Sequence, residues 1–79
     1  MPIMKIEILG TGCSKCHALE RSVREAVERF GLEAEVSKIE AIDEIVRRGV
    51  MMTPALVVDG TVKSSGRVLS ADDVRKLLQ

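Results

Sequence analysis

The feature that most constrains this chain is the stretch from Gly10 to His17, which reads GTGCSKCH and separates two segments of different periodicity. The run before it, Ile3 to Leu9, is almost wholly apolar, as in a central strand covered on both faces. The run after it, Ser14 to Phe30, has its apolar residues at helical spacing. The sequence therefore predicts a strand, a tight glycine-containing turn and a helix, with Cys13 in the first helical turn.

This position predicts different properties for the two cysteines. A helix N-terminus presents unpaired N–H groups and a partial positive charge, which should lower the pKa of Cys13 and raise its reactivity. Cys16 lies three residues further along, on the apolar face of the helix, and should be the more buried thiol. That face also carries Leu19, Val23, Ala26, Val27 and Phe30. One exposed, activated sulfur beside one shielded sulfur is what a dithiol exchange reaction needs.

Length and charge limit the classes of protein to be considered. A chain of 79 residues suffices for a single domain, residues 1–79, with a modest core that has Phe30 as its sole aromatic residue. Twelve basic residues balance twelve acidic ones, which argues against a nucleic-acid or anionic-membrane surface. No segment is long enough to span a bilayer, and the N-terminus lacks a signal-peptide layout. We therefore expect a cytoplasmic protein, in which two cysteines are more often catalytic or metal-binding than structural.

Two further elements are expected in the middle of the chain. Residues Glu33 to Ser37 alternate in polarity and predict a short strand. A helix is expected to begin at Ile39 or Glu40 and to end at Arg48, before Gly49. Its inner side is predicted to consist of Ile42, Ile45 and Val46.

The last third of the chain predicts a hairpin and a final helix. Ala55 to Val58 has the composition of a buried strand, and Thr61 to Ser65 returns as its partner across the turn residues Asp59 and Gly60. Gly66 ends that strand, and Ser70 is a candidate N-cap. The final helix is expected to turn Val74, Leu77 and Leu78 inward.

The predicted fold class is therefore α/β, with the element order β-α-β-α-β-β-α. A strand–helix–strand crossover implies a parallel pair of strands, and the hairpin implies an antiparallel pair. A mixed four-stranded sheet with helices on both faces satisfies both requirements.

The CxxC motif alone is compatible with several kinds of site. A structural zinc site needs about four ligands, and only Cys13, Cys16 and His17 lie close together in the sequence. The same residues match the CxxCH haem-attachment pattern, but nothing in the sequence indicates an axial partner or a haem pocket. His17 is expected to be exposed to solvent. We therefore predict no metal site, while a CxxC carrier of a soft ion such as Cu(I) stays open as an alternative.

Taken together, these motifs resemble the thioredoxin/glutaredoxin superfamily over essentially the whole chain. The resemblance rests on the run from Gly12 to Cys16 after a strand, on Met52 to Ala55 before another strand, and on the Asp59-Gly60 turn and last helix. It is closest to the small thioredoxin-like proteins known as redox-active disulfide proteins. It implies a minimal thioredoxin-like fold in which Pro54 follows a cis peptide bond and lies against the CxxC. It also implies that the backbone of Thr53 pairs with the extended chain of a substrate.

The resemblance also draws attention to residues that could tune the thiols. Glu7 stands six residues before Cys13, where thioredoxins carry a buried acid, and could accept a proton from Cys16. A surface or edge position for Glu7 is the alternative, because a buried unpaired carboxylate is costly. Lys15 adds a positive charge near the Cys13 thiolate unless it points outward. The run from Ser65 to Asp73 keeps only part of the pattern with which glutaredoxins bind glutathione, so glutathione binding is doubtful.

We therefore expect a thiol–disulfide oxidoreductase that reduces protein disulfides, with Cys13 attacking and Cys16 resolving. Disulfide-containing proteins are its expected partners, together with a thioredoxin reductase that regenerates the dithiol. We expect no cofactor beyond the redox-active Cys13–Cys16 disulfide, and a monomer. The alternatives are a glutathione-dependent glutaredoxin, the soft-metal carrier described above and a redox sensor without turnover.

Overall fold

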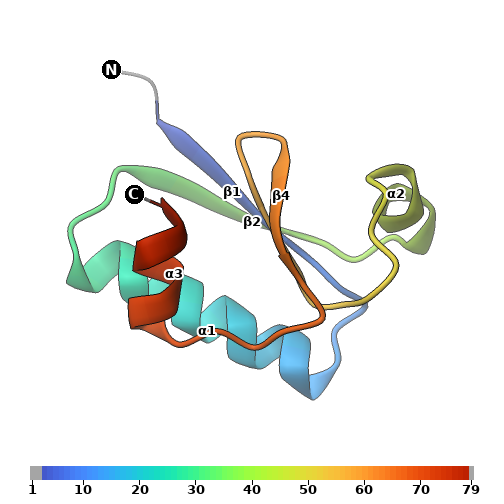
Figure 1. Ribbon diagram of the computed structural model, residues 1–79, viewed down its shortest axis with the longest axis horizontal. Coiled ribbons are helices and arrows are strands. Elements are labelled where there is room, and N and C mark those ends of the chain that lie inside the picture. Colours follow the sequence, from blue (N-terminus) through green and yellow to red (C-terminus); the bar gives the residue numbers. More distant parts are fainter. Residues whose placement is uncertain (1–2, 79) are drawn as a thin grey trace.

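A computed structural model describes residues 3–78, and Met1, Pro2 and Gln79 of the expected 1–79 domain lie outside the described residues. Three helices and four strands form in the predicted order within these residues (Figure 1). They are β1 (Met4–Leu9), α1 (Ser14–Arg29), β2 (Ala34–Ile39), α2 (Ile42–Arg47), β3 (Ala55–Val58), β4 (Thr61–Ser65) and α3 (Ala71–Leu78). None of these helices is long and apolar enough to cross a membrane.

The four strands form one mixed sheet in the order β2-β1-β3-β4. β1 runs parallel to β2 and antiparallel to β3, and β3 pairs with β4 in an antiparallel hairpin. Both turn residues of that hairpin, Asp59 and Gly60, have positive φ angles of 50° and 84°. Such a turn matches the twist of the flanking strands, which explains why the Asp-Gly pair predicted the hairpin correctly. β2 extends to Ile39, two residues beyond the predicted end.

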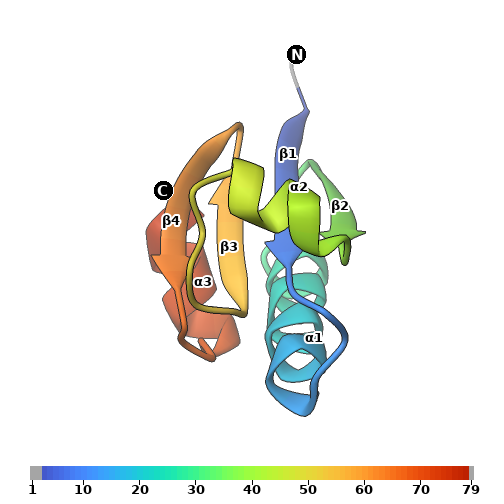
Figure 2. The ribbon, with the colours of Figure 1, turned by 90° about the vertical axis from the view of Figure 1, so that its right-hand side faces the viewer.

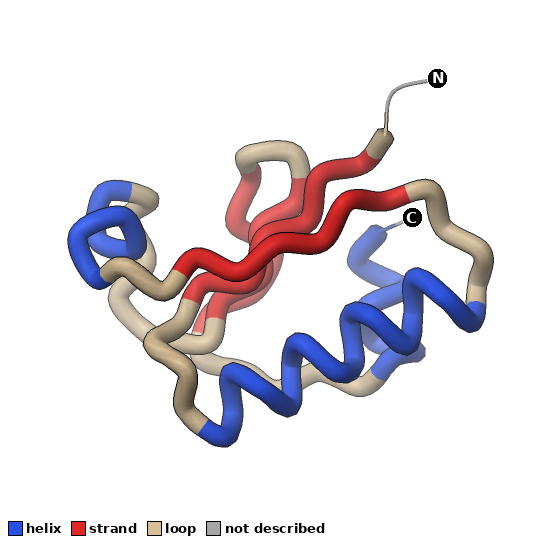
Figure 3. The backbone as a smooth tube through the Cα atoms, turned by 180° about the vertical axis from the view of Figure 1, so that it is seen from behind, coloured by secondary structure: helices blue, strands red, loops and turns tan. Residues whose placement is uncertain are grey.

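One face of the sheet is covered by α1 and α3, which lie beneath it in Figure 1 and are seen from behind in Figure 3. Alternate residues of β1 and β3 point toward these helices, because side chains alternate between the two faces of a strand. The buried cluster on this face comprises Ile6, Ile8, Leu19, Val23, Ala26, Leu56, Val58, Leu69, Ala71 and Val74. Ser70 caps α3 as predicted, since its Oγ accepts a hydrogen bond from the Asp73 N–H at 3.1 Å.

The other face carries a smaller cluster and is covered by α2 at one end. Figure 2 shows α2 across the sheet from α1. This cluster contains Leu9, Ile45, Val50, Ala55 and Val57, with Ile39 packed against it. Helices therefore lie on both faces, as predicted, and α2 lies at the end of the sheet where β1 leads into α1.

The predicted inner side of α2 is wrong for two of its three residues. Ile45 is buried, but Ile42 and Val46 are 67% and 66% exposed. The helix is also shorter than predicted, since it begins at Ile42 rather than at Ile39 or Glu40. The spacing of Ile42, Ile45 and Val46 puts them on one side of the helix, but α2 covers only one end of the sheet, and Ile45 alone packs into the cluster on this face.

Candidate active site

The end of β1 and the start of α1 bring the two cysteines together. Cys13 is the N-cap of α1, and its sulfur accepts a hydrogen bond from the Cys16 N–H at 3.3 Å. The two Sγ atoms lie 2.6 Å apart, and both cysteines are present as thiols. Cys13 is exposed, whereas Cys16 is buried with 6% of its surface accessible. The structure thus has the asymmetry that the helical spacing predicted.

Hydrogen bonding and burial move the pKa values of the two thiols in opposite directions. The side-chain hydrogen bond from Cys16 lowers the pKa of Cys13, and the backbone N–H groups of Cys16 and Lys15 add to this effect. Burial raises the pKa of Cys16, and its hydrogen bond to Cys13 raises it further. At neutral pH the proton therefore stays on Cys16, and the accessible sulfur at Cys13 is the one favoured as thiolate.

The side chains of Lys15 and His17, which flank Cys16 in the sequence, are both exposed to solvent. Lys15 is exposed, and it is the backbone N–H of Lys15, not its ammonium group, that lowers the pKa of Cys13. His17 is exposed too, as expected. Among residues 3–78 no three His, Cys, Asp or Glu side chains form a group able to hold a metal ion.

Gly10 and Pro54 form the wall behind the buried sulfur. A Cβ atom at position 10 would collide with the Sγ of Cys16 and would lie 3.9 Å from the Cα of Pro54. Pro54 is fully buried at this point. Only glycine at position 10 therefore leaves room for the Cys16 sulfur between the end of β1 and the Pro54 loop.

The loop that carries Thr53 and Pro54 is tied to the end of β4. The Pro54 carbonyl accepts a hydrogen bond from the Gly66 N–H at 2.8 Å, and the Met52 carbonyl accepts one from the Ser65 Oγ at 2.7 Å. The Thr53–Pro54 peptide bond is cis. Thr53 itself is exposed, and its N–H and C=O have no backbone partner within residues 3–78.

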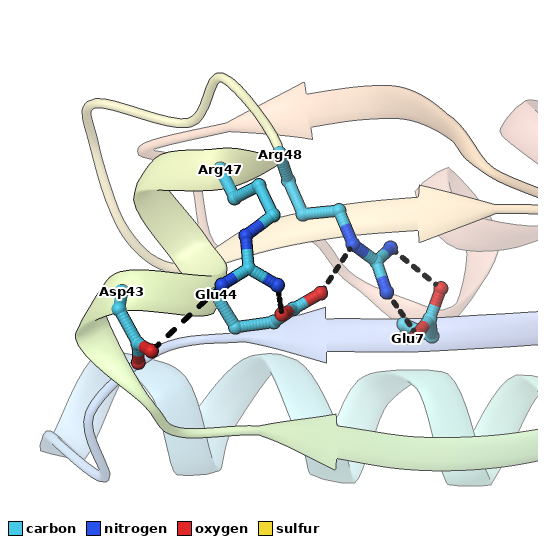
Figure 4. A network of polar contacts seen from close by, with 5 residues as sticks. All are labelled: Glu7, Asp43, Glu44, Arg47 and Arg48. Atoms are coloured by element: carbon cyan, nitrogen blue, oxygen red, sulfur yellow. Dashed lines mark hydrogen bonds and ion pairs between the residues drawn. The ribbon is translucent and has the colours of Figure 1, made fainter.

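Glu7 is buried in the central strand β1, with 4% of its surface exposed, so a surface or edge position is wrong. Its two carboxylate oxygens each accept a 2.9 Å hydrogen bond from the Arg48 guanidinium (Figure 4). These bonds lower the pKa of Glu7 despite its burial. Glu7 also alternates with Ile6 and Ile8, which face α1, so it points to the face that α2 covers. A carboxylate whose two oxygens each accept a hydrogen bond from a guanidinium is a poor acceptor for a proton from Cys16.

A cavity of about 10 Å³ lies beside Cys16, with room for roughly one water molecule. Its lining includes Cys16 together with His17, Glu20 and Glu40. The otherwise buried thiol therefore adjoins a small cavity with ionisable residues in its lining, on the side of α1 that faces β2.

Three residues important to this site were missed from the sequence alone. Gly10 could have been identified, because a glycine that directly follows a buried strand often marks a close approach of another group. Arg48 and Ser65 gave no such indication. Their partners, Glu7 and Met52, lie 41 and 13 residues away in the chain, and only the fold brings them into contact.

Comparison with known proteins identifies relatives along nearly the whole chain. Residues 4–79 match the family model described as the thioredoxin domain. A thioredoxin from Methanothermobacter thermautotrophicus is 46% identical over 76 residues, which cover 96% of this chain and 99% of the relative. A thioredoxin from Methanocaldococcus jannaschii is 34% identical over 74 residues, covering 94% of this chain and 85% of the relative.

Solved structures share the fold at much lower identity. A structure titled as a malarial protein has a TM-score of 0.75 at 12% identity and covers 98% of this chain and 94% of its own. Thioredoxin-2 of the malaria parasite, described as a component of its protein secretion machinery, has a TM-score of 0.72 at 13% identity. This match covers 96% of the present chain and 81% of thioredoxin-2. With the family match, the close relatives and the paired cysteines, the chain belongs to the thioredoxin domain family and is a thiol–disulfide oxidoreductase acting on disulfide-containing proteins.

Proposed function

We propose that Cys13 is the attacking thiolate and that Cys16 is the resolving thiol. The observation that carries this assignment is the asymmetry between them: Cys13 is exposed at a helix N-cap and its sulfur accepts a hydrogen bond from the Cys16 N–H, whereas the Cys16 sulfur is buried. The exposed sulfur can reach a disulfide on another protein. The buried sulfur can reach only Cys13.

The reaction then proceeds in two exchange steps. The Cys13 thiolate attacks one sulfur of the substrate disulfide, which forms a mixed disulfide and releases the other substrate sulfur as a thiolate that takes up a proton. Cys16 then loses its proton, and its thiolate attacks the Cys13 Sγ. The mixed disulfide breaks, the second substrate thiol leaves, and the Cys13–Cys16 disulfide holds the oxidising equivalents. The small cavity beside Cys16, which has room for roughly one water molecule, supports release of the Cys16 proton toward solvent.

The loop at Thr53 supplies the surface for the substrate backbone. Thr53 is exposed, with backbone groups that have no backbone partner within residues 3–78, and it directly precedes Pro54 behind the buried sulfur. An extended segment of the substrate can add to these groups as a short strand. A Thr53→Pro variant lacks the N–H and should lose about fivefold in kcat/KM, as for one hydrogen bond. The matched Thr53→Ala variant keeps the N–H and should retain the parental value.

The proposal also covers how the Cys13–Cys16 disulfide is reduced again, and in which compartment and oligomeric state the protein works. A thioredoxin reductase in the cytoplasm returns the disulfide to the dithiol, and the protein works as a monomer, since one chain supplies both cysteines and the Thr53 loop. Reduction of the protein by a reductase in a coupled assay, with glutathione alone as the comparison, tests this assignment. Efficient turnover with glutathione alone would instead indicate a glutaredoxin.

The experiment that tests the assignment of the two thiols is alkylation as a function of pH, with the modified cysteine identified by mass spectrometry. Cys13 should react with a midpoint below the usual thiol value of about 8.5, while Cys16 stays protected. Two matched variants separate the causes. Cys16→Ser keeps a donor beside Cys13 and should keep its pKa low, whereas Cys16→Ala removes that donor and should raise it. Equal rates for both thiols at an ordinary pKa would contradict the assignment.

Trapping provides the complementary readout. The Cys16→Ser variant should accumulate mixed disulfides with substrate proteins through Cys13, because the resolving step is lost. The Cys13→Ser variant should accumulate none, since Cys16 is buried. Mixed disulfides formed through Cys16 would reverse the roles.

A further inference from the structure

A second cavity, of about 220 Å³, lies between β4 and α3, and it has no lining residue in common with the cavity beside Cys16. Its walls come from β4, from the segment that follows it and from α3. The lining residues are Lys63, Ser64, Arg67, Leu69, Asp73, Lys76 and Leu77. The dithiol chemistry described above uses none of them.

The cavity is strongly basic. Lys63, Arg67 and Lys76 each contribute a positive charge, and Asp73 contributes the single negative one, so the formal charge of the lining is +2. Within residues 3–78 none of the three cations forms an ion pair, although most other arginines of the helices do. The Asp73 carboxylate takes part in the cap of α3, where its Oδ2 accepts a hydrogen bond from the Ser70 N–H at 3.5 Å. Three unpaired cations around one hollow create a field that favours an anion.

A hydroxyl group in the same lining lacks a partner. The Oγ of Ser64 is buried and makes no hydrogen bond, the sole such side-chain atom among residues 3–78. Ser64 pairs across the sheet with Leu56, which belongs to the cluster beneath α1 and α3, so Ser64 also faces the α3 side. Buried polar atoms in native proteins nearly always have a partner, so an unpaired one in the wall of a cavity indicates a ligand or water that completes it.

We propose that this cavity binds a small phosphate monoester. A phosphate group carries about −1.5 to −2 charges at neutral pH and several strong acceptor oxygens, which matches the three cations and the Ser64 hydroxyl. Leu69 and Leu77 line the remainder and suit a short carbon chain. The volume is below the roughly 300–1,000 Å³ typical of pockets for larger ligands, so a dinucleotide does not fit. This binding site lies apart from the dithiol and does not depend on the proposed function.

Titration by ¹H–¹⁵N NMR at constant ionic strength tests the proposal, with inorganic phosphate and butyl phosphate as probes and chloride as the reference anion. We expect saturable shifts that are confined to Lys63–Arg67 and α3, with butyl phosphate binding more tightly than inorganic phosphate. Shifts that do not saturate, that chloride reproduces, or that spread over the basic residues of the whole chain would overturn the proposal.

Variants assign the binding to these residues. Each of Lys63→Gln, Arg67→Gln and Lys76→Gln should weaken butyl phosphate binding about two- to fivefold, as expected for exposed charge contacts, and the triple variant should abolish it. Arg21→Gln, which removes an exposed cation of α1 outside the cavity, should leave the affinity unchanged. Unchanged binding by the triple variant would refute the site. Disulfide reductase activity within about twofold of the parent serves as the check that each variant is folded.

Ser64→Ala supplies a readout that charge alone would not affect. Without ligand the variant should melt at or above the parental temperature, because it loses an unpaired buried hydroxyl. Its increase in melting temperature on adding butyl phosphate should be smaller than that of the parent. A Ser64→Ala protein that melts lower without ligand and responds fully to butyl phosphate would show that the hydroxyl already has a partner, and would remove Ser64 from the site.

Discussion

Replacing Arg48 by Met should destabilise the protein strongly, because Glu7 is then left as a buried carboxylate without a partner. Two 2.9 Å hydrogen bonds join the side chains, and the side chain of Glu7 is only 5% exposed. Breaking a buried pair by removing one partner costs about 3–5 kcal/mol. The Arg48 side chain is 29% exposed, so water partly reaches Glu7 and we expect about 2–4 kcal/mol. For a domain of this size that corresponds to a fall in melting temperature of about 10–25 °C.

The dependence on pH distinguishes this cause from lost packing. In the parent, Arg48 lowers the pKa of Glu7, so the stabilisation by the pair is complete above the unfolded pKa of about 4.3 and is lost as pH falls through the folded pKa. In Arg48→Met, burial raises the pKa of Glu7 above its unfolded value. The destabilisation of Arg48→Met by the unpaired Glu7 carboxylate is therefore full near pH 8, and it decreases as the pH falls through that raised pKa. The difference in unfolding free energy between the two proteins should narrow from pH 8 to pH 4.

Urea denaturation at a series of pH values measures both effects. Arg47→Met is the matched control, because Arg47 pairs with Asp43 and Glu44 on the exposed side of α2, and it should change stability by less than about 0.5 kcal/mol. The double variant Glu7→Leu/Arg48→Met should recover most of the loss, since an apolar pair of similar volume often replaces a buried ion pair without cost. A loss below about 0.5 kcal/mol for Arg48→Met, or one independent of pH, would refute the reasoning.

The same double variant also tests whether Glu7 takes part in proton transfer. Because the Glu7 carboxylate is held by Arg48 on the face of the sheet away from α1, its removal should leave disulfide reductase activity within about twofold of the parent. A folded double variant that resolves mixed disulfides much more slowly would identify Glu7 as the proton acceptor of Cys16.

Three further predictions concern the dithiol and the helix cap. The redox potential should be roughly −230 to −280 mV, between glutaredoxin and thioredoxin values, because hydrogen bonds from Cys16 and Lys15 are what lower the pKa of Cys13. Equilibration with glutathione and dithiothreitol buffers measures it. Gly10→Ala should lower the free energy of unfolding by about 1–3 kcal/mol through overpacking, and it should slow the resolving step at least tenfold in stopped-flow assays. Gly31→Ala is the control: its new Cβ has no neighbour within 4 Å, so the resolving step should be unchanged. Ser70→Ala should lose about 0.5–2 kcal/mol in urea denaturation through the missing cap of α3, with activity retained; a stability equal to the parent would show that the Ser70 cap contributes nothing.

Local sequence patterns were sufficient to predict most of the fold and the unequal exposure of the two thiols. The bounds of β3 and β4 agree with those predicted, and α1 ends one residue before the predicted end. These elements are specified by short-range effects: the alternation or helical spacing of apolar residues, the positive φ angles of the Asp59-Gly60 turn and the cap at Ser70. The exposure of Cys13 and the burial of Cys16 follow likewise from their positions relative to the start and the apolar face of one helix.

Tertiary structure alone decided the contacts between distant segments. The spacing of Ile42, Ile45 and Val46 places all three on one side of α2, but which of them is buried depends on how this short helix packs on the sheet. The pairing of Glu7 with Arg48, and the fit of the Cys16 sulfur against Gly10, each require side chains from different elements to meet at a specific place. Local sequence patterns identified Cys13 and Cys16 as the candidate redox residues and predicted their unequal exposure, because both features depend on a single helix terminus. They could not determine which groups surround and support the two cysteines, because those contacts exist only once the sheet and its helices have assembled.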